Sequence, residues 1–315
     1  MGVKNFDQLC FADDLIQQRK TRKQSSLERI DAKVDWQPIA DLLSVTRART
    51  GRKGYPPLLM FKCLLLAQWY DLADEALEFR VSDSLSLRRF VGLPLDHVAP
   101  DETSFVNFRK VLRHHGLEHR LFDEIARQLD AAGLILRKGT IMDATIVTAA
   151  VKKPAFKEGE VSMADPDAEF FKKNGTQYFG YKLHTGVDQG SGLIRKLLGS
   201  GASLYDGEAS WDLISWDEQQ VSGDKAYENQ RLRRELHDAG ITDAIMKKKP
   251  KGKPEPVWMK YFNKAISSFR FEVEQPFGIG KTCSGLGRTR FRGLKAVKTQ
   301  FYFFAMSYNL KRAFG

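Results

Sequence analysis

The sequence predicts an α/β protein in which a mixed β-sheet flanked by helices follows an all-helical region. Two observations predict this fold class. Between residues 54 and 136, apolar side chains such as Phe61, Leu65 and Trp69 recur at the spacing of one helix face. After Gly133 the pattern changes to short β-branched runs that alternate with helical segments. We therefore expect the helices first and the sheet second.

The N-terminal part of the chain is rich in charge and in predicted helices. Residues 1–53 form a basic segment, with the clusters RKTRK at 19–23 and RARTGRK at 47–53 on either side of a short helix at 36–43. The next helix opens at Pro56-Pro57, because proline suits the first turn. Further helices are expected at 71–81, 84–91, 101–114 and 117–132. A helix-turn-helix reader of DNA and a plain helical bundle both fit this pattern.

The C-terminal part predicts the sheet. Strands are expected at 139–149, 178–188, 193–203, 219–227 and 241–249, and residues 150–174 are expected to form a polar loop. The second and third of these strands are joined by QGSG, a hairpin signal. Helices are expected at 208–216, at 229–239 and finally over the stretch SSFRFEVEQPFGIGK at 267–281. The chain therefore divides into the segments 1–53, 54–136 and 137–315.

Composition excludes several classes of protein. The 315 residues are 42% hydrophobic and 28% charged, as in a soluble globular chain. The longest apolar run, LLMFKCLLLAQWY, is interrupted by Lys62 and is too short to span a membrane. The N-terminus lacks the pattern of a secretory signal. Cys10, Cys63 and Cys283 are scattered, which argues against a disulfide framework and a zinc cluster. A reducing cytoplasm fits these features best.

The positive charge is concentrated at the C-terminal end. Residues 247–315 contain 16 Lys and Arg against 3 Asp and Glu, a net charge of +13, whereas the rest of the chain is close to neutral at −2. Aromatic side chains, among them Trp258, Tyr261 and Phe271, are interleaved with these cations. This composition favours contact with nucleic acid, although a solvated surface gives the same charge count.

Acidic residues in three distant segments are candidates for a metal site. Asp143 lies within an apolar strand, where a charge is costly unless something compensates it. Asp224 ends the fourth predicted strand, which can lie beside the first, and Glu272 or Glu274 belongs to the last helix. Carboxylates are the ligands that Mg²⁺ prefers, and two such ions can drive phosphodiester cleavage. Each acid taken alone also fits a structural role; the combination with fold order and basicity points to chemistry.

Helix geometry separates the two glutamates. At about 100° per residue, Arg270, Glu274 and Lys281 share one narrow stripe, and Glu272 falls on the other side of the helix. We therefore expect Glu274 to face the site with the two cations and Glu272 to be dispensable. Pro276 can bend the helix and interrupt the stripe before Lys281.

Taken together, these residues resemble the DDE transposases of bacterial insertion sequences, in particular the IS-five family, over nearly the whole chain. DATIV, YFGYKLHTGVDQGSGLI and GDKAY are similar to the segments around the family's two aspartates. Arg270, Glu274 and Lys281 match the family's last signature in spacing. Ser267 stands where the family has tyrosine, and GASLYD replaces its Asn-x-His-Asp segment, which keeps Asp206 without a defined role.

The resemblance implies an RNase H-like catalytic domain at 137–315 and a DNA-binding and dimerisation region at 54–136. Asp143, Asp224 and Glu274 would be the catalytic, metal-binding triad, holding two Mg²⁺ ions that Mn²⁺ can replace. The partners would be double-stranded DNA, as terminal inverted repeats and target, and a second copy of the chain. The enzyme would cut the ends of its element, and the freed 3′ hydroxyl would attack target DNA.

The resemblance also implies a set of contacts to DNA. These would come from Arg270 and Lys281, from Lys182 and His184 on one strand face, and from Arg288, Arg290 and Arg292 in the basic tail. A surface salt bridge at Arg270 or Lys281, and a structural role for His184, fit equally well. Two further classes of function remain open: a transposase-derived DNA-binding protein without cleavage activity, and another RNase H-like nuclease that cuts but never joins ends.

Overall fold

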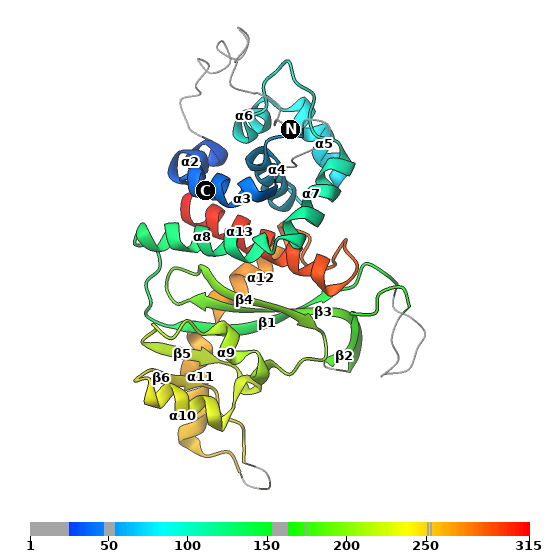
Figure 1. Cartoon of the computed structure of the whole chain (residues 1–315). Helices are drawn as coiled ribbons and strands as arrows, with labels where there is room; N and C mark the ends of the chain where they lie inside the picture. Colours follow the sequence, from blue (N-terminus) through cyan, green and yellow to red (C-terminus); the bar gives the residue numbers. More distant parts are fainter. Residues whose placement is uncertain (1–24, 47–53, 153–162, 174, 251, 253) are drawn as a thin grey trace. The chain divides into compact units, whose positions relative to one another are not determined.

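A computed structural model describes residues 25–46, 54–152, 163–173, 175–250, 252 and 254–315. The chain forms two compact units (Figure 1). The first contains the residues up to Ala131 together with Tyr302–Gly315, and the second contains Ala132–Phe301. Both N-terminal basic clusters, at 19–23 and 47–53, lie outside the described residues. The C-terminal end of the chain thus belongs to the helical unit, whereas the sequence assigned it to the catalytic domain.

The first unit is helical, as the apolar spacing predicts. Its elements are α2 (Ser26–Lys33), α3 (Trp36–Leu43), η1 (Ser44–Thr46), α4 (Pro57–Trp69), α5 (Asp74–Asp83), α6 (Leu85–Val91), α7 (Glu102–His114) and α8 (Leu117–Ala131). The side chain of Asp101 accepts a hydrogen bond from the backbone N–H of Ser104 and so caps α7, which confirms the predicted start signal. The expected helix boundaries are reproduced to within a few residues.

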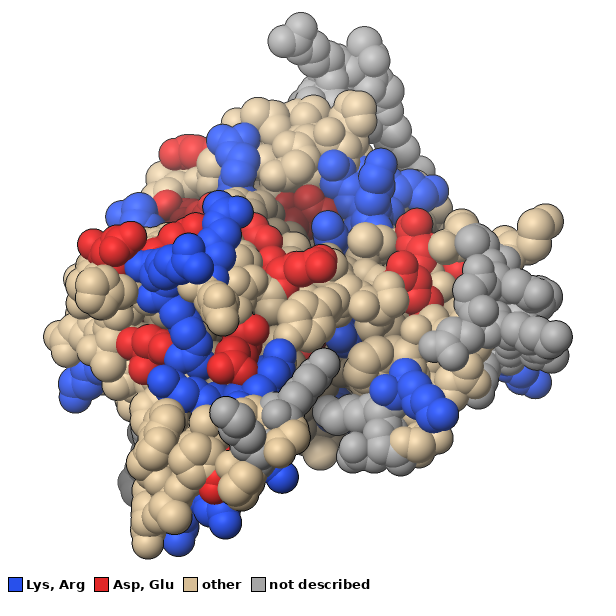
Figure 2. All heavy atoms as spheres, turned by 90° about the horizontal axis from the view of Figure 1, so that it is seen from below, with Lys and Arg blue, Asp and Glu red and all other residues tan. Residues whose placement is uncertain are grey.

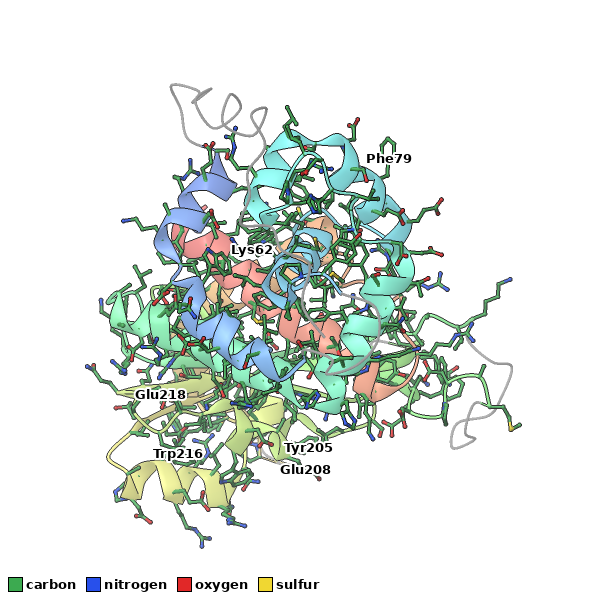
Figure 3. The ribbon with its side chains drawn as sticks, turned by 45° about the horizontal axis from the view of Figure 1, so that its top comes forward. Lys62, Phe79, Tyr205, Glu208, Trp216 and Glu218 are labelled. Carbon is green, nitrogen blue, oxygen red and sulfur yellow. The ribbon has the colours of Figure 1, made fainter. Side chains whose placement is uncertain are left out.

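The core of the first unit forms around α4, whose residues from Leu59 to Leu66 are all buried. Lys62 is among them (Figure 3), and its Nζ lies 2.6 Å from Asp31 Oδ1 and 4.3 Å from the centre of the Trp36 ring. Trp69 Nε1 donates a 2.6 Å hydrogen bond to the carbonyl of Ser307. This bond explains why the end of the last helix, α13 (Leu294–Phe314), belongs to the helical unit. No helix among the described residues is long and apolar enough to cross a membrane.

The second unit is built on a six-stranded mixed sheet. The strands are β1 (Thr140–Thr148), β2 (Glu169–Lys173), β3 (Thr176–Asp188), β4 (Ile194–Gly201), β5 (Gln220–Gly223) and β6 (Thr242–Ile245). Their order is β2-β3-β1-β5-β6, with β4 paired to β3. The β1–β5 and β5–β6 pairs are parallel and the other pairs are antiparallel. The mixed sheet, its flanking helices and the helical region before it confirm the predicted fold class.

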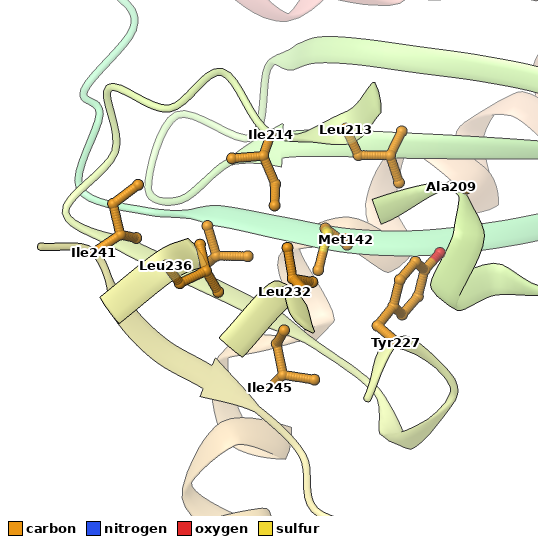
Figure 4. Packing of buried hydrophobic residues seen from close by; sticks show 10 residues of the cluster. Met142, Ala209, Leu213, Ile214, Tyr227, Leu232, Leu236, Ile241 and Ile245 are labelled. Atoms are coloured by element: carbon orange, nitrogen blue, oxygen red, sulfur yellow. The ribbon is translucent and has the colours of Figure 1, made fainter. Parts of the chain in front are cut away.

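The two faces of this sheet carry different helices. Short η2 (Asp206–Glu208), α9 (Ser210–Leu213), η3 (Lys225–Tyr227) and α10 (Gln230–Asp238) lie on one face, and α11 (Val257–Phe269) and α12 (Phe271–Cys283) lie on the other (Figure 1). On the first face Met142, Val221, Leu232 and Leu236 pack into one buried cluster (Figure 4). Burying each such side chain contributes roughly 1.5–3 kcal/mol, so this cluster fixes α10 against β1 and β5.

Three local predictions are wrong. Residues 169–173 form β2 within the segment expected to be a loop, because β3 supplies a hydrogen-bonding partner that local sequence does not reveal. The helix expected at 208–216 is reduced to α9 and the turn η2. The last helix is divided at Arg270, which separates α11 from α12. Pro276 does not break α12, whose last residue is Cys283.

Candidate active site where β1 and β5 stop pairing

Two aspartates lie where the parallel pairing of β1 with β5 ends, Asp143 within β1 and Asp224 just after β5. The last residue pair of β1 with β5 is Met142 with Gly223, and Asp143 and Asp224 are the next residues on each strand. Because side chains alternate along a strand, Asp143 points to the face opposite Met142, the face of the sheet on which α12 packs against β1. Both aspartates are half-buried. The predicted adjacency of the first and fourth expected strands is therefore confirmed.

Hydrogen bonds to the backbone position both carboxylates. Asp224 Oδ1 accepts a 2.8 Å hydrogen bond from the N–H of Ala226, which caps the short helix η3. Asp143 Oδ1 accepts a 2.8 Å hydrogen bond from the N–H of Ala144. Gly223 precedes Asp224 for a steric reason: a Cβ at this position would lie 3.2 Å from Tyr227 Cδ2. Glycine at position 223 thus allows the end of β5 to lie close to the ring of Tyr227.

Arg270 supplies the cation closest to this pair. Its Nη2 lies 3.2 Å from Asp143 Oδ2, and both side chains keep about a fifth of their surface exposed. Arg270 lies at the junction between α11 and α12. It has helical backbone angles and is both the C-cap of α11 and the N-cap of α12. The break in the predicted helix therefore falls at the residue that binds Asp143.

The two glutamates of α12 have different surroundings. Glu274 is exposed and lies one turn after Arg270. Glu272 Oε2 accepts a 2.7 Å hydrogen bond from the N–H of Gly190, in the turn between β3 and β4. Lys281 lies in the last turn of α12 and is exposed. Glu272 is thus a structural acceptor for the hairpin, and Glu274 is the glutamate that faces solvent.

The described residues contain no group of three or more His, Cys, Asp and Glu side chains gathered closely enough to hold a metal ion. The three acids of the predicted triad are oxygen donors of the kind that Mg²⁺ and Mn²⁺ take. Asp143 and Asp224 are register neighbours, but Glu274 does not complete a cluster with them here. The role of the three acids as metal ligands therefore stays a prediction.

A second charged cluster lies on the opposite face of the sheet, around Asp206 in η2. Lys182 Nζ lies 3.0 Å from Asp206 Oδ1 and donates a 2.7 Å hydrogen bond to the carbonyl of Leu204. His184 Nδ1 is 3.7 Å from the same Asp206 oxygen, and its Nε2 is 3.1 Å from Ser200 Oγ. We call Lys182, His184, Ser200 and Asp206 the Asp206 cluster.

Lys182 and His184 are buried in this cluster, and His184 is completely inaccessible to solvent. Burial lowers the pKa of His184 to about 4; Asp206 opposes this effect and Lys182 adds to it. The imidazole is therefore neutral at pH 7. The role of Lys182 and His184 as DNA contacts stays a prediction. In this structure both side chains face Asp206. The sequence signal for this pairing was their alternate spacing on β3.

Tyr227 is buried near the acidic residues of both clusters. Its ring is 1% exposed and packs on Met142, with the hydroxyl pointing toward the segment of Ala209 (Figure 4). The hydroxyl oxygen is buried and has no hydrogen-bond partner among the described residues. Burial, together with the nearby carboxylates of Asp143, Asp206 and Asp224, raises the pKa of Tyr227 well above its ordinary value. No spacing or periodic signal in the sequence marks this unsatisfied group, because it arises from tertiary packing.

Arg288 in the basic tail has a structural role. Arg288 pairs with the end of β1 through a bridge to Thr148, and its guanidinium donates to the carbonyl of Ala150 at 2.8 Å. Arg290 and Arg292 are exposed. Figure 2 shows Lys and Arg interleaved with Asp and Glu over the face that it presents, rather than one uninterrupted basic field. Contact with a polyanion on this face would therefore depend on local groups of cations.

A mixed sheet with helices on both faces and two aspartates where adjacent parallel strands stop pairing defines an α/β protein with an acidic site. Comparison with known families assigns the class more closely. Residues 136–310 match the transposase DDE domain and residues 14–111 match the transposase domain DUF772. The chain belongs to the transposase DDE domain family. Domains of this family depend in general on divalent metal ions.

Among solved structures, the chain is similar to a piggyBac transposase in a synaptic complex with hairpin DNA, determined by cryo-electron microscopy. The two share 11% sequence identity with a TM-score of 0.46, over 90% of this chain and 71% of the piggyBac chain.

Proposed function

We propose that this protein is the transposase of a bacterial insertion sequence of the IS-five kind, which cuts the ends of its element and joins them to target DNA. The observation that supports this most strongly is the register of β1 and β5, which sets Asp143 beside Asp224. The third acid, Glu274, lies on α12, which packs against β1. The family membership supports transposition as the biological process.

Asp143, Asp224 and Glu274 would hold the divalent ions, Mg²⁺ or Mn²⁺. When bound, two such ions lower the pKa of an attacking water and stabilise the leaving oxygen of a phosphodiester. The residues themselves have two tasks before that step. Asp143 has to share or release its ion pair with Arg270, and Glu274 has to turn from solvent toward the two aspartates. Movement at the α11–α12 junction serves both tasks.

Arg270 would then take a second role. The guanidinium of Arg270, which pairs with Asp143 in this structure, would be able to pair instead with a phosphate of the DNA beside the scissile bond. Lys281, on the same helix, would contribute a second phosphate contact, and the exposed Arg290 and Arg292 a third region of contact. These cations offset the repulsion between an acidic site and a polyanion.

The DNA partners would be double-stranded terminal inverted repeats and target DNA. The helical region at 54–136 would bind DNA or a second copy of the chain, and the domain at 137–315 would carry the chemistry. Two copies are expected to hold the two ends together, because joining requires both ends in one complex.

The test is cleavage of a labelled duplex that carries one end of the element. Mg²⁺-dependent cleavage should be abolished by each of three single substitutions, Asp143→Asn, Asp224→Asn and Glu274→Gln. Each variant should still bind the same duplex in EDTA. Glu272→Gln is the matched control two residues from Glu274, and it should keep cleavage because Glu272 serves the β3–β4 turn. Cleavage by all three triad variants at the wild-type rate would refute the assignment.

A second assay separates the alternatives. A pre-cut donor with a free 3′ hydroxyl should be joined to target DNA by the wild-type protein. A nuclease of another RNase H-like type would cut but leave this donor unjoined. A DNA-binding derivative would bind the end and perform neither step, whatever the metal ion.

A further inference from the structure

The helix before Arg270 exposes aromatic side chains to solvent. On α11, Trp258 is 56% and Tyr261 is 71% exposed, whereas Met259 and Ile266 are buried. At about 100° per residue, Tyr261 lies in the middle of the solvent-facing arc of this helix, and Lys264 lies about 60° from it. These rings therefore contribute little to the core of their own unit, and their exposure needs another explanation.

Lysines accompany these rings at fixed positions. Lys247 Nζ lies 5.3 Å from the centre of the Trp258 ring, within the range of a cation–π contact. The backbone of Lys247 is held on α11 by Asn263, whose Oδ1 accepts from the Lys247 N–H at 2.9 Å and whose Nδ2 donates to the Lys247 carbonyl at 3.1 Å. Asn263 is buried. The lysine and the aromatic ring are thus placed together by the fold.

The other end of α11 is followed by Arg270, which contacts Asp143 of the candidate active site. The same pattern of lysine beside an aromatic ring continues to the loop before Asp206. Lys248 Nζ donates a 2.8 Å hydrogen bond to the hydroxyl of Tyr205 and lies 5.5 Å from the centre of its ring. The N–H of Lys248 donates to Glu228 Oε2 at 2.8 Å. Tyr205, which is 45% exposed (Figure 3), directly precedes Asp206. We define the aromatic–lysine ribbon as the residues that run from this loop onto α11: Tyr205, Lys247, Lys248, Trp258, Tyr261 and Lys264.

We propose that the aromatic–lysine ribbon binds an unpaired DNA strand that leaves the cleavage site. Lysines neutralise the phosphates of such a strand, and exposed rings stack on its bases. A closed duplex offers phosphates but no free base faces, so rings at this position would add nothing to duplex binding. The proposal rests on the proposed function, because it takes the site beside Asp143 and Asp224 to be where DNA is cut.

A second copy of the chain is a poorer occupant. An interface between two identical faces brings each residue close to its own counterpart across a twofold axis. Four exposed lysines lie on or beside this face: Lys248, Lys249, Lys260 and Lys264. Pairing the face with itself would therefore bring like charges together, which costs several kcal/mol in an interface. A strand of DNA meets the same lysines with opposite charge.

The test measures binding by fluorescence anisotropy in EDTA, with the full chain and three DNAs. These are a blunt duplex, the same duplex with a single-stranded overhang, and that duplex with an abasic overhang. The double variant Trp258→Ala with Tyr261→Ala should bind the overhang roughly ten- to a hundredfold more weakly than the wild type. It should bind the blunt duplex equally well. The wild type should also lose affinity when the overhang is abasic.

Trp216→Ala is the matched control, because Trp216 is 39% exposed in the second unit, outside the ribbon and the candidate active site, and its loss should affect none of the three DNAs. Equal loss of affinity for blunt and overhanging DNA would assign the ribbon to duplex binding and overturn the proposal. Unchanged binding to all three DNAs would also overturn it. A change of oligomeric state in the double variant, measured by sedimentation, would show that the face binds protein. Because EDTA prevents cleavage, failure of the triad assignment leaves these results interpretable.

Discussion

The carboxylates of Asp143 and Asp206 lie on opposite faces of the same sheet and are neutralised differently. Asp206 binds the buried ammonium of Lys182 at 3.0 Å and has the neutral imidazole of His184 beside it. Asp143 keeps a partly exposed contact with Arg270 at 3.2 Å and has Asp224 at the end of the next strand. The two carboxylates are similarly exposed, at 23% for Asp206 and 20% for Asp143, but their partners differ. We call the Asp206 cluster closed because Lys182 and His184 are buried, and the Asp143 pair open because Arg270 is partly exposed.

This difference teaches how one sheet supports both stability and chemistry. Charges that are buried need their partners in order to fold. Charges that are half-exposed can be released to a ligand at little cost. Substitutions in the two clusters should therefore separate loss of activity from loss of stability, and the following expectations run from the largest effect to the smallest.

Asp224→Asn should have the largest effect on activity. Removing one carboxylate should lower strand cleavage on the order of a thousandfold, which corresponds to about 4 kcal/mol of lost transition-state stabilisation. The free energy of unfolding should stay the same or increase, because asparagine keeps the cap on η3 and repulsion from Asp143 is removed. Single-turnover cleavage and urea unfolding measure the two quantities. Comparable loss of both would contradict an open site.

Lys182→Met should have the opposite profile, with its main effect on stability. The variant leaves the Asp206 carboxylate without its cation, so the free energy of unfolding should fall by about 3 kcal/mol in urea. The control is Arg231→Met, which breaks the exposed pair with Glu235 and should cost less than about 1 kcal/mol. Equal effects of the two variants would show that the Asp206 cluster is not closed. Adding Asp206→Leu to Lys182→Met should restore part of the loss.

His184 should give the Asp206 cluster a pH dependence. Its pKa falls from 6.5 in the unfolded chain to about 4 in the folded protein, so the unfolded state binds the proton more readily. The stability that His184 contributes is therefore complete above pH 6.5 and is lost as pH falls toward 4, by at most about 3 kcal/mol. The difference in unfolding free energy between wild type and His184→Leu, followed from pH 7.5 to 4, should shrink as pH falls. A constant difference would contradict the shift.

Tyr227→Phe should have the smallest effect on stability. The buried hydroxyl has no hydrogen-bond partner among the described residues, so its removal should change the free energy of unfolding by less than about 1 kcal/mol and can increase it. Thermal unfolding of the variant beside wild type measures this. A loss above about 2 kcal/mol would mean that the hydroxyl has a partner in solution, most plainly one of the surrounding carboxylates.

The sequence by itself determined the helical region and the strands that became β1, β3, β4, β5 and β6. It also placed Asp143 within the first strand and Asp224 at the end of the fourth. These features follow from hydrophobic period, turn residues and helix caps, which act between residues a few positions apart. The division of the two glutamates on α12 also came from local geometry, because helix spacing alone sets Glu272 and Glu274 on different sides.

Only the tertiary structure decided how distant charges are paired. Strand β2 forms because β3 lies beside it, Arg270 divides the last helix where it meets Asp143, and Asp206 acquires Lys182 and His184 as partners. None of these pairings leaves a periodic signal, because the partners are far apart in the sequence and meet only when the sheet has formed. The unsatisfied hydroxyl of Tyr227 and the alignment of lysines with the rings of α11 have the same origin. Local sequence sets which side chains a strand or helix presents, and the packing of the sheet sets what each of them contacts.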